Sequence, residues 1–537
     1  MEEGTEELMK AFDMETSNLT QFLKADDNIR IGAAAGDQVI SKLAGMVAGV
    51  IIMILFTYVI SVFVIHEIEK ENSIIGTLYA LGVTKKQLLK YYLTVPVIVT
   101  FLAGLAGMII GYSPIGIPTQ MQDCYDYFSI PELTPELLIY LLVYGIIMPP
   151  FVAVIVNYFV IRKKLSRPAL SMIRNEQKKN HISKVRLGDM PFLTKFRIRQ
   201  SLREARAGFT VVFGMFMALL VMMIGLDCYV MCDHISKENK KDTKFEYMYT
   251  YKYPDKKVPK GGDACFVKGL HKEIWGYDLE ISLIGIENDN PYFSQDKDLP
   301  KAKNKVVISS AMAQKYDLKK GDSIILSEED EMDYAFQVAD ITQYSSGLYA
   351  FMDIDSMRDL FQTSSDYYNM VVSKKKLSID SGKLYATTSK KAIEESSDVF
   401  INMMIPMMGM IVGLSVIIYA IVMYLMIKVM IDRSAQNIAL MKVFGYRKKE
   451  IKKLYLDGNF YMIAIGALIS VPLSKKLMDA MYPVMVSNIA CGMNLSFTWQ
   501  MYALIYAGII ITYLVINKLL VRKIYKVGLS DALKNRE

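Results

Sequence analysis

The stretch HEIEKENSIIGTLYALGVTKKQLLKYYL, residues 66–93, is a polar segment between two very apolar ones. Within it Ile75, Leu78 and Leu81 recur at three-residue spacing, which predicts a short helix with one apolar stripe. Gly82 follows directly, at the position where a helix of this kind ends. Because the segment itself is too polar for lipid, the stripe must be covered by a partner, by the neighbouring spans or by the membrane interface.

The same stretch recurs as MIDRSAQNIALMKVFGYRKKEIKKLYL, residues 430–456. When residues 70–93 are aligned with residues 433–456, seven of 24 positions are identical, several times more than chance gives. The identical pairs are Ile75 and Ile438, Gly82 and Gly445, Lys85 and Lys448, Lys86 and Lys449, Lys90 and Lys453, Tyr92 and Tyr455, and Leu93 and Leu456. The stripe recurs as Ile438, Met441 and Phe444, so the chain is a duplicated unit.

Two further segments repeat around this stretch. GMVAG at residues 45–49 returns as GMIVG at 409–413, and KLSRPALS at 164–171 returns as KIYKVGLS at 523–530. Glycines four residues apart let two membrane helices approach closely, although single pairs are common by chance. Because the pattern recurs at matching places, we expect four glycines to lie at helix contacts: Gly45, Gly49, Gly409 and Gly413.

These features together resemble the FtsX-like, or MacB-like, permease family of ABC transporters. The resemblance consists of a span, a short helix reading I-x-x-L-x-x-L/F-G-x-x-K-K, two more spans and a basic tail ending near L-S-x-A-L, and it covers nearly the whole chain. It implies two tandem permease units, the first without its initial span and extracytoplasmic domain. Members with two units usually have both, so we expect either a genuine seven-span protein or a truncated, split or mis-started chain.

The composition indicates an integral membrane protein. Of the 537 residues, 52% are hydrophobic, and the mean hydropathy is +0.24, which is too apolar for a soluble chain of this length. The net charge of +7 does not indicate nucleic-acid binding, because the basic residues are concentrated in particular connections.

Seven segments are long enough to cross the hydrocarbon core: residues 40–65, 92–112, 137–161, 209–231, 400–428, 455–473 and 499–520. The connection at 113–136 has no Lys or Arg, whereas the one at 162–206 has fourteen. The positive-inside rule therefore places the basic connections and the C-terminus in the cytoplasm and the N-terminus outside the plasma membrane.

The predicted fold class is an α-helical polytopic membrane protein with an extracytoplasmic α+β domain. The predicted parts are an outer tail (1–38), a first permease unit (39–161), a basic cytoplasmic linker with an interfacial helix (162–208), a fourth span (209–231), the α+β domain (232–399), a second permease unit (400–520) and a cytoplasmic tail (521–537). Within the domain, strands are predicted at 245–252, 279–286, 305–308, 323–327 and 334–341, and helices at 310–316 and 355–361.

Motifs for catalysis and for metal or cofactor binding are missing from the sequence. It contains no phosphate-binding G-x-x-x-x-G-K-[ST], no H-E-x-x-H and no G-x-S-x-G. The spans contain few charged groups, and the main exception, Asp227, is expected at the membrane interface. Cys124 and Cys491 fall in matching outer loops, where a bridge is conceivable. We therefore predict neither an enzyme nor a cofactor site, and energy supplied by a partner.

The preferred function is the membrane subunit of an ABC transporter, which the resemblance implies. Its expected partners are an ATPase homodimer or pair, membrane lipids, no nucleic acid, and an extracytoplasmic partner or substrate such as a lipid or peptide. The alternative is a signalling or scaffold protein that regulates an outer partner such as a cell-wall hydrolase. The residues expected to couple to the ATPase are Ile75, Leu78, Leu81, Gly82, Lys85 and Lys86, and in the repeat Ile438, Met441, Phe444, Gly445, Lys448 and Lys449.

Overall fold

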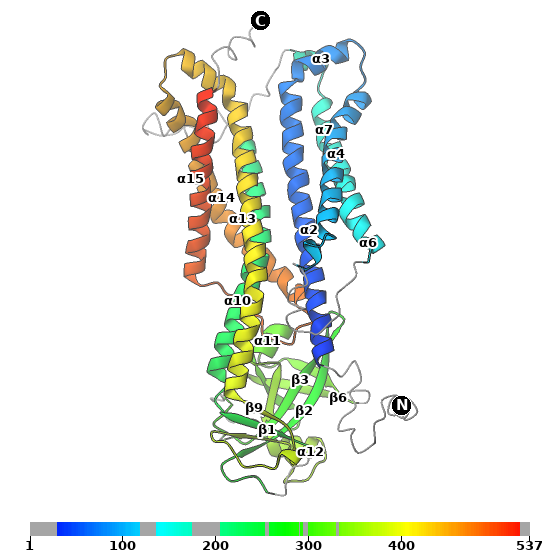
Figure 1. Cartoon of the computed structure of the whole chain (residues 1–537), viewed down its shortest axis with the longest axis vertical. Helices are drawn as coiled ribbons and strands as arrows, with labels where there is room; N and C mark the ends of the chain where they lie inside the picture. Colours follow the sequence, from blue (N-terminus) through cyan, green and yellow to red (C-terminus); the bar gives the residue numbers. More distant parts are fainter. Residues whose placement is uncertain are drawn as a thin grey trace.

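The structure, a computed structural model, describes residues 29–118, 136–173, 205–252, 257–288, 290–293, 299–328 and 332–526. Long helices run side by side through the upper part of Figure 1, and the strands gather below them in one domain. A short helix, α3 (Asn72–Ala80), lies at the far end of the bundle from that domain. We call the end of the bundle that carries α3 the elbow end, because the chain turns there from one span into the next. The other end, next to the strands, is the domain end.

Seven helical segments in the described residues are long and apolar enough to cross a membrane, which confirms the predicted number. They lie in α2 (Ile29–Lys70), α4 (Lys85–Gly111), the continuous α6, η2 and α7 (Ile139–Leu142, Val143–Ile147 and Met148–Leu165), α10 (Ala205–Asp242), α13 (Lys390–Val443), α14 (Lys448–Met485) and α15 (Trp499–Lys526). A further short helix, α8 (Ala169–Ile173), follows α7.

The long helices form two groups (Figure 1). Helices α2, α4, α6 and α7 make the first group, and α10, α13, α14 and α15 make the second. The groups meet where α2 packs against α10, and there the rings of Tyr58 and Phe213 contact edge to face with centroids 4.7 Å apart. Val59 and Val62 of α2 share one apolar core with Met215 of α10, so the two groups are joined through buried side chains.

The domain contains a nine-stranded sheet, of which six strands close into a ring. The strands are β1 (Tyr247–Tyr251), β2 (Asp263–Ile274), β3 (Tyr277–Ile286), β4 (Lys305–Ser309), β5 (Ser323–Ser327), β6 (Asp333–Thr342), β7 (Tyr349–Asp353), β8 (Met370–Ser373) and β9 (Leu384–Ser389). The ring follows the order β2, β3, β7, β4, β6 and β5 and returns to β2, and β8, β1 and β9 continue the sheet from β2. Leu270, Ile281 and Phe336 belong to the core of the ring.

Two helices and one 3₁₀ turn complete the domain. Helix α11 (Ser310–Tyr316) follows β4 on the side of the ring that faces the bundle, and α12 (Ile354–Leu360) follows β7 on the opposite side (Figure 1). The 3₁₀ turn η4 (Ser381–Lys383) precedes β9. The predicted fold class, helical spans with an α+β domain, is therefore confirmed.

The structure differs from the sequence expectations in where the helices end. Helix α2 begins at Ile29 and not at residue 39, and the predicted domain limits at 232 and 399 fall inside α10 and α13. Charged residues beyond the spans stay helical there because α10 and α13 pack on each other outside the apolar segment, as the bond from Asn239 Nδ2 to Ser397 Oγ shows. The outer tail at 1–28 and the linker at 174–204, with most of its predicted interfacial helix, lie outside the described residues.

Candidate functional site: two helix elbows and the domain junction

Residues 71–84, which we call the first elbow, turn the chain from α2 into α4. Helix α2 ends at Lys70, α3 follows after Glu71, and Gly82 ends α3 with a φ of +92°. The Val83 N–H donates to the Leu78 carbonyl, the bond that closes a helix end at a left-handed glycine. The chain then enters α4 at once, so the elbow is a rigid turn without a flexible loop.

The inner face of the first elbow is buried by the chain itself. Ile75 is 1% exposed and belongs to a small apolar core with Ile68, Leu88 and Leu165. Gly76 faces α8 so closely that a Cβ there would lie 2.9 Å from the Ile173 backbone nitrogen. The first residue of the predicted stripe therefore packs against the spans, which leaves only its later residues for a partner.

Polar contacts also hold the first elbow. The Tyr92 hydroxyl donates to Glu71 Oε2 at 2.6 Å, and the Tyr79 hydroxyl donates to the Leu165 carbonyl at 2.9 Å. Burial raises the pKa of Tyr79, which keeps this hydroxyl protonated as a donor. Lys164 pairs with Glu69. The end of α2 and the end of α7 are thereby attached to the same turn.

Residues 434–447, the second elbow, repeat the end of this turn but not its beginning. Helix α13 continues without a break to Val443, and Gly445 then ends it with a φ of +85°. The Tyr446 N–H donates to the Met441 carbonyl in the same pattern as in the first elbow. The Arg447 N–H is accepted by Glu450 Oε2 at 2.8 Å, as the Thr84 N–H is accepted by Gln87 Oε1. The two repeats therefore share one helix-stop geometry.

Exposure along the two stripes changes in the same order. The first residues, Ile75 and Ile438, are fully buried, and the second, Leu78 and Met441, are half-buried. The third, Leu81 and Phe444, are 76% and 72% exposed. Further exposed apolar residues adjoin them: Ile74 in the first elbow, and Leu440, Val443 and Tyr446 in the second. Each elbow thus presents a small apolar surface beside its glycine.

The lysines after the glycines are only partly described. Lys85 and Lys86 are exposed at the start of α4. The side chains of Lys448 and Lys449 lie outside the described part of the chain. The coupling role assigned to these residues stays a prediction.

Among the four predicted packing glycines, one lies at a helix contact. A Cβ at Gly49 would lie 2.3 Å from the hydroxyl oxygen of Tyr144, which comes from η2. Among the described atoms none lies within 4 Å of a Cβ built at Gly45, Gly409 or Gly413, so their packing role stays a prediction. Two other glycines in this region approach each other just as closely: a Cβ at Gly104 would lie 2.3 Å from the Gly145 carbonyl oxygen.

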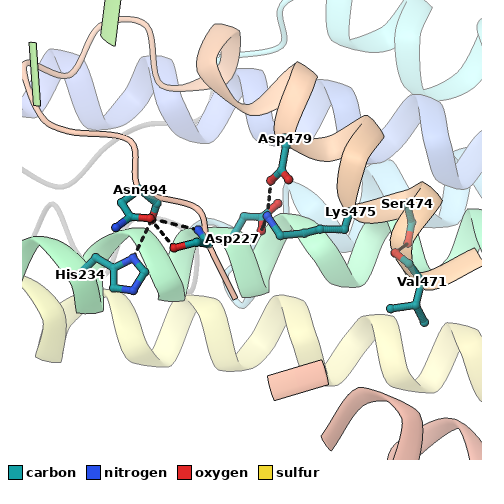
Figure 2. A network of polar contacts seen from close by, with 8 residues as sticks. Asp227, His234, Val471, Ser474, Lys475, Asp479 and Asn494 are labelled. Carbon is teal, nitrogen blue, oxygen red and sulfur yellow. Dashed lines mark hydrogen bonds and ion pairs between the residues drawn. The ribbon is translucent and has the colours of Figure 1, made fainter. Parts of the chain in front are cut away.

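At the domain end, an ion pair joins α10 to α14. Asp227 is fully buried, and Lys475 Nζ lies 3.0 Å from its Oδ1. Its expected position at the membrane interface stays a prediction. Lys475 also pairs with Asp479 and lies over the ring of Phe497, 4.3 Å from its centroid. Figure 2 shows Lys475 between the two carboxylates. A buried carboxylate needs such a counter-ion, so the pair fixes the two helices against each other.

The loop after α14, residues 486–498, links the same helices to the domain. His234 Nδ1 of α10 lies 2.8 Å from the Asn494 carbonyl oxygen, and Asn494 Nδ2 donates to Glu238 Oε1 (Figure 2 shows the first contact). From the other side, Lys315 of α11 donates to the Val486 carbonyl at 2.7 Å. We call this loop with α11 the junction.

Lys315 is buried at the junction, where it is 4% exposed. Burial lowers the pKa of Lys315 to about 8, and nearby Cys491 raises it to a smaller extent. Cys124 lies outside the described residues, so the structure does not test the conceivable bridge between Cys124 and Cys491.

Helices α10 and α13 continue past the spans as a pair that ends on the domain. Asp242, the last residue of α10, accepts hydrogen bonds from the Ser345 N–H and hydroxyl, both at 3.1 Å, and from Gln343 Nε2. Lys240 pairs with Asp398 of α13. At the start of α13, the Lys390 N–H donates to the Glu246 carbonyl. No flexible segment therefore separates the spans from the sheet along these two helices.

Within the described residues, no group of three or more His, Cys, Asp or Glu side chains is placed to hold a metal ion. A family model described as FtsX-like permease C-terminal matches the chain twice, over residues 46–165 and 409–529. The first match contains the first elbow and the second match contains the second elbow. No curated protein shows a significant match to the chain.

Proposed function

The chain belongs to the FtsX-like permease family, with one permease domain in each half, and from this premise we propose that it is the membrane subunit of an ABC transporter. A separate ATPase, as a homodimer or pair, docks on the two elbows and supplies the energy. The chain transmits the resulting movement to its α+β domain, which exports or releases a lipid, peptide or similar substrate.

The observation that supports this proposal is the matched exposure of Leu81 and Phe444. Each lies beside a helix-stop glycine, on a turn whose first stripe residue, Ile75 or Ile438, is fully buried. A partner that contacts these side chains pushes on a rigid turn, and the push is transferred to α2, α4, α13 and α14. An exposed apolar residue at the same place in both repeats suits a partner that offers two similar grooves.

The orientation belongs to the same proposal. The Lys and Arg residues of the two elbows and of the 162–206 connection support a cytoplasmic elbow end and an α+β domain outside the plasma membrane. A cysteine-free background with Ser73→Cys or Ser378→Cys tests this, because both positions are exposed. Ser378→Cys should react with an impermeant maleimide on intact cells, and Ser73→Cys only after permeabilisation. The opposite labelling would reverse the orientation.

The docking test uses the double variant Leu81→Glu with Phe444→Glu. A charge buried without a partner costs several kcal/mol, so ATPase affinity should fall by about 100-fold or more. Copurification with the ATPase and stimulation of ATP hydrolysis are the measurements. Ile325→Glu is the matched control, because Ile325 is 49% exposed on the distant domain. Unchanged copurification and stimulation in the double variant would rule out docking at these residues.

A further inference from the structure

The end of the β2–β3 hairpin extends beyond the start of β7. Strands β2 and β3 pair from Phe266 opposite Gly285 as far as Ile274 opposite Tyr277. On one side β7 pairs with β3 only from Ser282 onward, and on the other β5 pairs with β2 only at His271. From Lys272 to Ile281 the hairpin therefore makes strand pairings only within itself.

The strand directions place the tip of this hairpin on the side of the domain that faces the spans. Strand β3 runs parallel to β7. Helix α12, which follows β7, packs on Gly285 near the end of β3, and it lies on the far side of the domain (Figure 1). The start of β3 consequently points toward the bundle. The Tyr316 hydroxyl donates to the Lys272 carbonyl of the hairpin, and the preceding Lys315 donates to the Val486 carbonyl in the loop after α14.

Trp275 occupies the tip in an unfavourable conformation and an unfavourable environment. Its φ is +53°, in the left-handed region that bulky residues rarely adopt, and Gly276 follows with a φ of +82°. Its side chain is 66% exposed. Two-residue hairpin turns of this kind favour asparagine or aspartate before glycine, so neither the turn nor the domain core explains the indole. A backbone outlier of this kind suggests a functional contact.

We propose that Trp275 inserts into the lipid headgroup region of the leaflet on the domain side, so that the hairpin tip anchors the α+β domain to the membrane surface. Tryptophan favours this region because its ring is apolar and its N–H is polar. Lys272, Glu273 and Asp278 beside it have mixed charge, so zwitterionic lipid suffices. The anchor rests on the membrane assignment of the chain and is independent of ATPase docking.

The chain has two tryptophans, which makes the anchor directly measurable. In the full chain with Trp499→Phe, Trp275 is the only indole. Reconstituted in phosphatidylcholine nanodiscs, its emission should be blue-shifted, resist iodide, and fall by half or more when a shallow nitroxide-labelled lipid is included. Emission that the labelled lipid leaves unchanged would overturn the anchor: iodide sensitivity would then place the tip in water, and protection from iodide would place it against another protein.

The matched control is Trp275→Phe, which leaves Trp499. Trp499 is 76% exposed at the start of a span, so the labelled lipid should quench it as well. Subtracting the emission of Trp275→Phe from that of the wild type gives the emission of Trp275 while Trp499 stays in place. The test therefore remains valid if the Trp499→Phe variant folds poorly. A difference signal that the labelled lipid does not reduce would again overturn the anchor.

Discussion

The two repeats end their elbows alike but reach them differently. In the first, α2 stops at Lys70 and α3 is a separate helix, whereas in the second α13 runs through 54 residues to Val443 without a stop. In the first repeat α4 packs mainly on α7, and in the second α14 packs mainly on α10. The conserved part of the duplication is thus the turn at the glycine, and the surroundings of each turn have diverged.

The packing partners explain this divergence. Gly466 of α14 faces α10, where its Cβ would lie 2.6 Å from a Val212 methyl, while the matching Ala103 of α4 is exposed. Gly104, the next residue of α4, instead approaches Gly145 of η2. In the second repeat α14 is therefore joined closely to the helix that enters the α+β domain, whereas in the first repeat α4 packs on α7 and η2.

The largest expected effect tests the contact that α14 has and α4 lacks. Lys475→Met leaves Asp227 buried without its counter-ion and should destabilise the protein by about 3–5 kcal/mol. The matching position in the first repeat is Tyr112, where Tyr112→Phe should cost about 1 kcal/mol or less, because only an exposed bond to the Glu136 carbonyl is lost. Denaturant unfolding in detergent measures both.

A control variant combines Lys475→Met with Asp227→Asn and should recover most of the lost stability, because the uncompensated charge is gone. If Lys475→Met proves as mild as Tyr112→Phe, the ion pair does not distinguish the repeats.

The next effect tests whether the two elbows are packed equally well. Ile75→Ala and Ile438→Ala each remove a fully buried side chain and should each cost about 2–5 kcal/mol. Thermal unfolding of the two variants, with the exposed Leu81→Ala as a control, gives the comparison. A cost at Ile438 far below that at Ile75 would show that the second elbow is loosely packed and that only its backbone repeats the first.

The third effect concerns the junction, which the structure describes in the second repeat. Since the pKa of Lys315 is about 8 in the folded protein and 10.5 in the unfolded chain, the unfolded chain binds more protons between these values. Stability should therefore rise as pH increases from 8 to 10.5, by up to about 3 kcal/mol. Lys315→Met should flatten this part of the pH profile. An identical slope in the variant and the wild type would assign the dependence to other groups.

The smallest effect tests what the repeats share. Gly82→Ala and Gly445→Ala both place a Cβ on a left-handed residue and should each cost about 1 kcal/mol. Gly107→Ala is the control, because it lies in open space within α4 and is expected to be neutral or slightly stabilising. Unequal costs at the two elbow glycines, measured by thermal unfolding, would mean that the common turn has different strain in the two repeats.

Local patterns were sufficient to predict much of the fold. The seven spans were predicted from apolar runs, and the helix ends at the elbow glycines were predicted from the repeat, because a few neighbouring residues determine where a helix ends. Strands β1, β3, β4, β5 and β6 were predicted from the sequence pattern. Strand β2 was missed because Gly269 and several polar residues interrupt its pattern, and its length is fixed by pairing with β3, β5 and β8.

The site could be predicted only in part, because burial depends on contacts between distant segments. Ile75 and Leu81 belong to one stripe in the sequence, but α8 and α7 cover only the first. Likewise nothing near Asp227 in the sequence indicates Lys475, which lies on another helix. Trp275 is recognisable in the sequence, but its significance depends on its φ and on the direction of β3.

The joint between α13 and the sheet limits how the domain can move. Strand β9 leads directly into α13, and β1, which follows α10 closely, pairs with β9 from Tyr247 opposite Ser389. Sliding one helix along the other by a single turn, about 5.4 Å, would break this pairing. Helices α10 and α13 therefore move as one unit. Displacement at the elbows reaches the domain as a swing or a twist of the whole pair and not as a slide of one helix along the other.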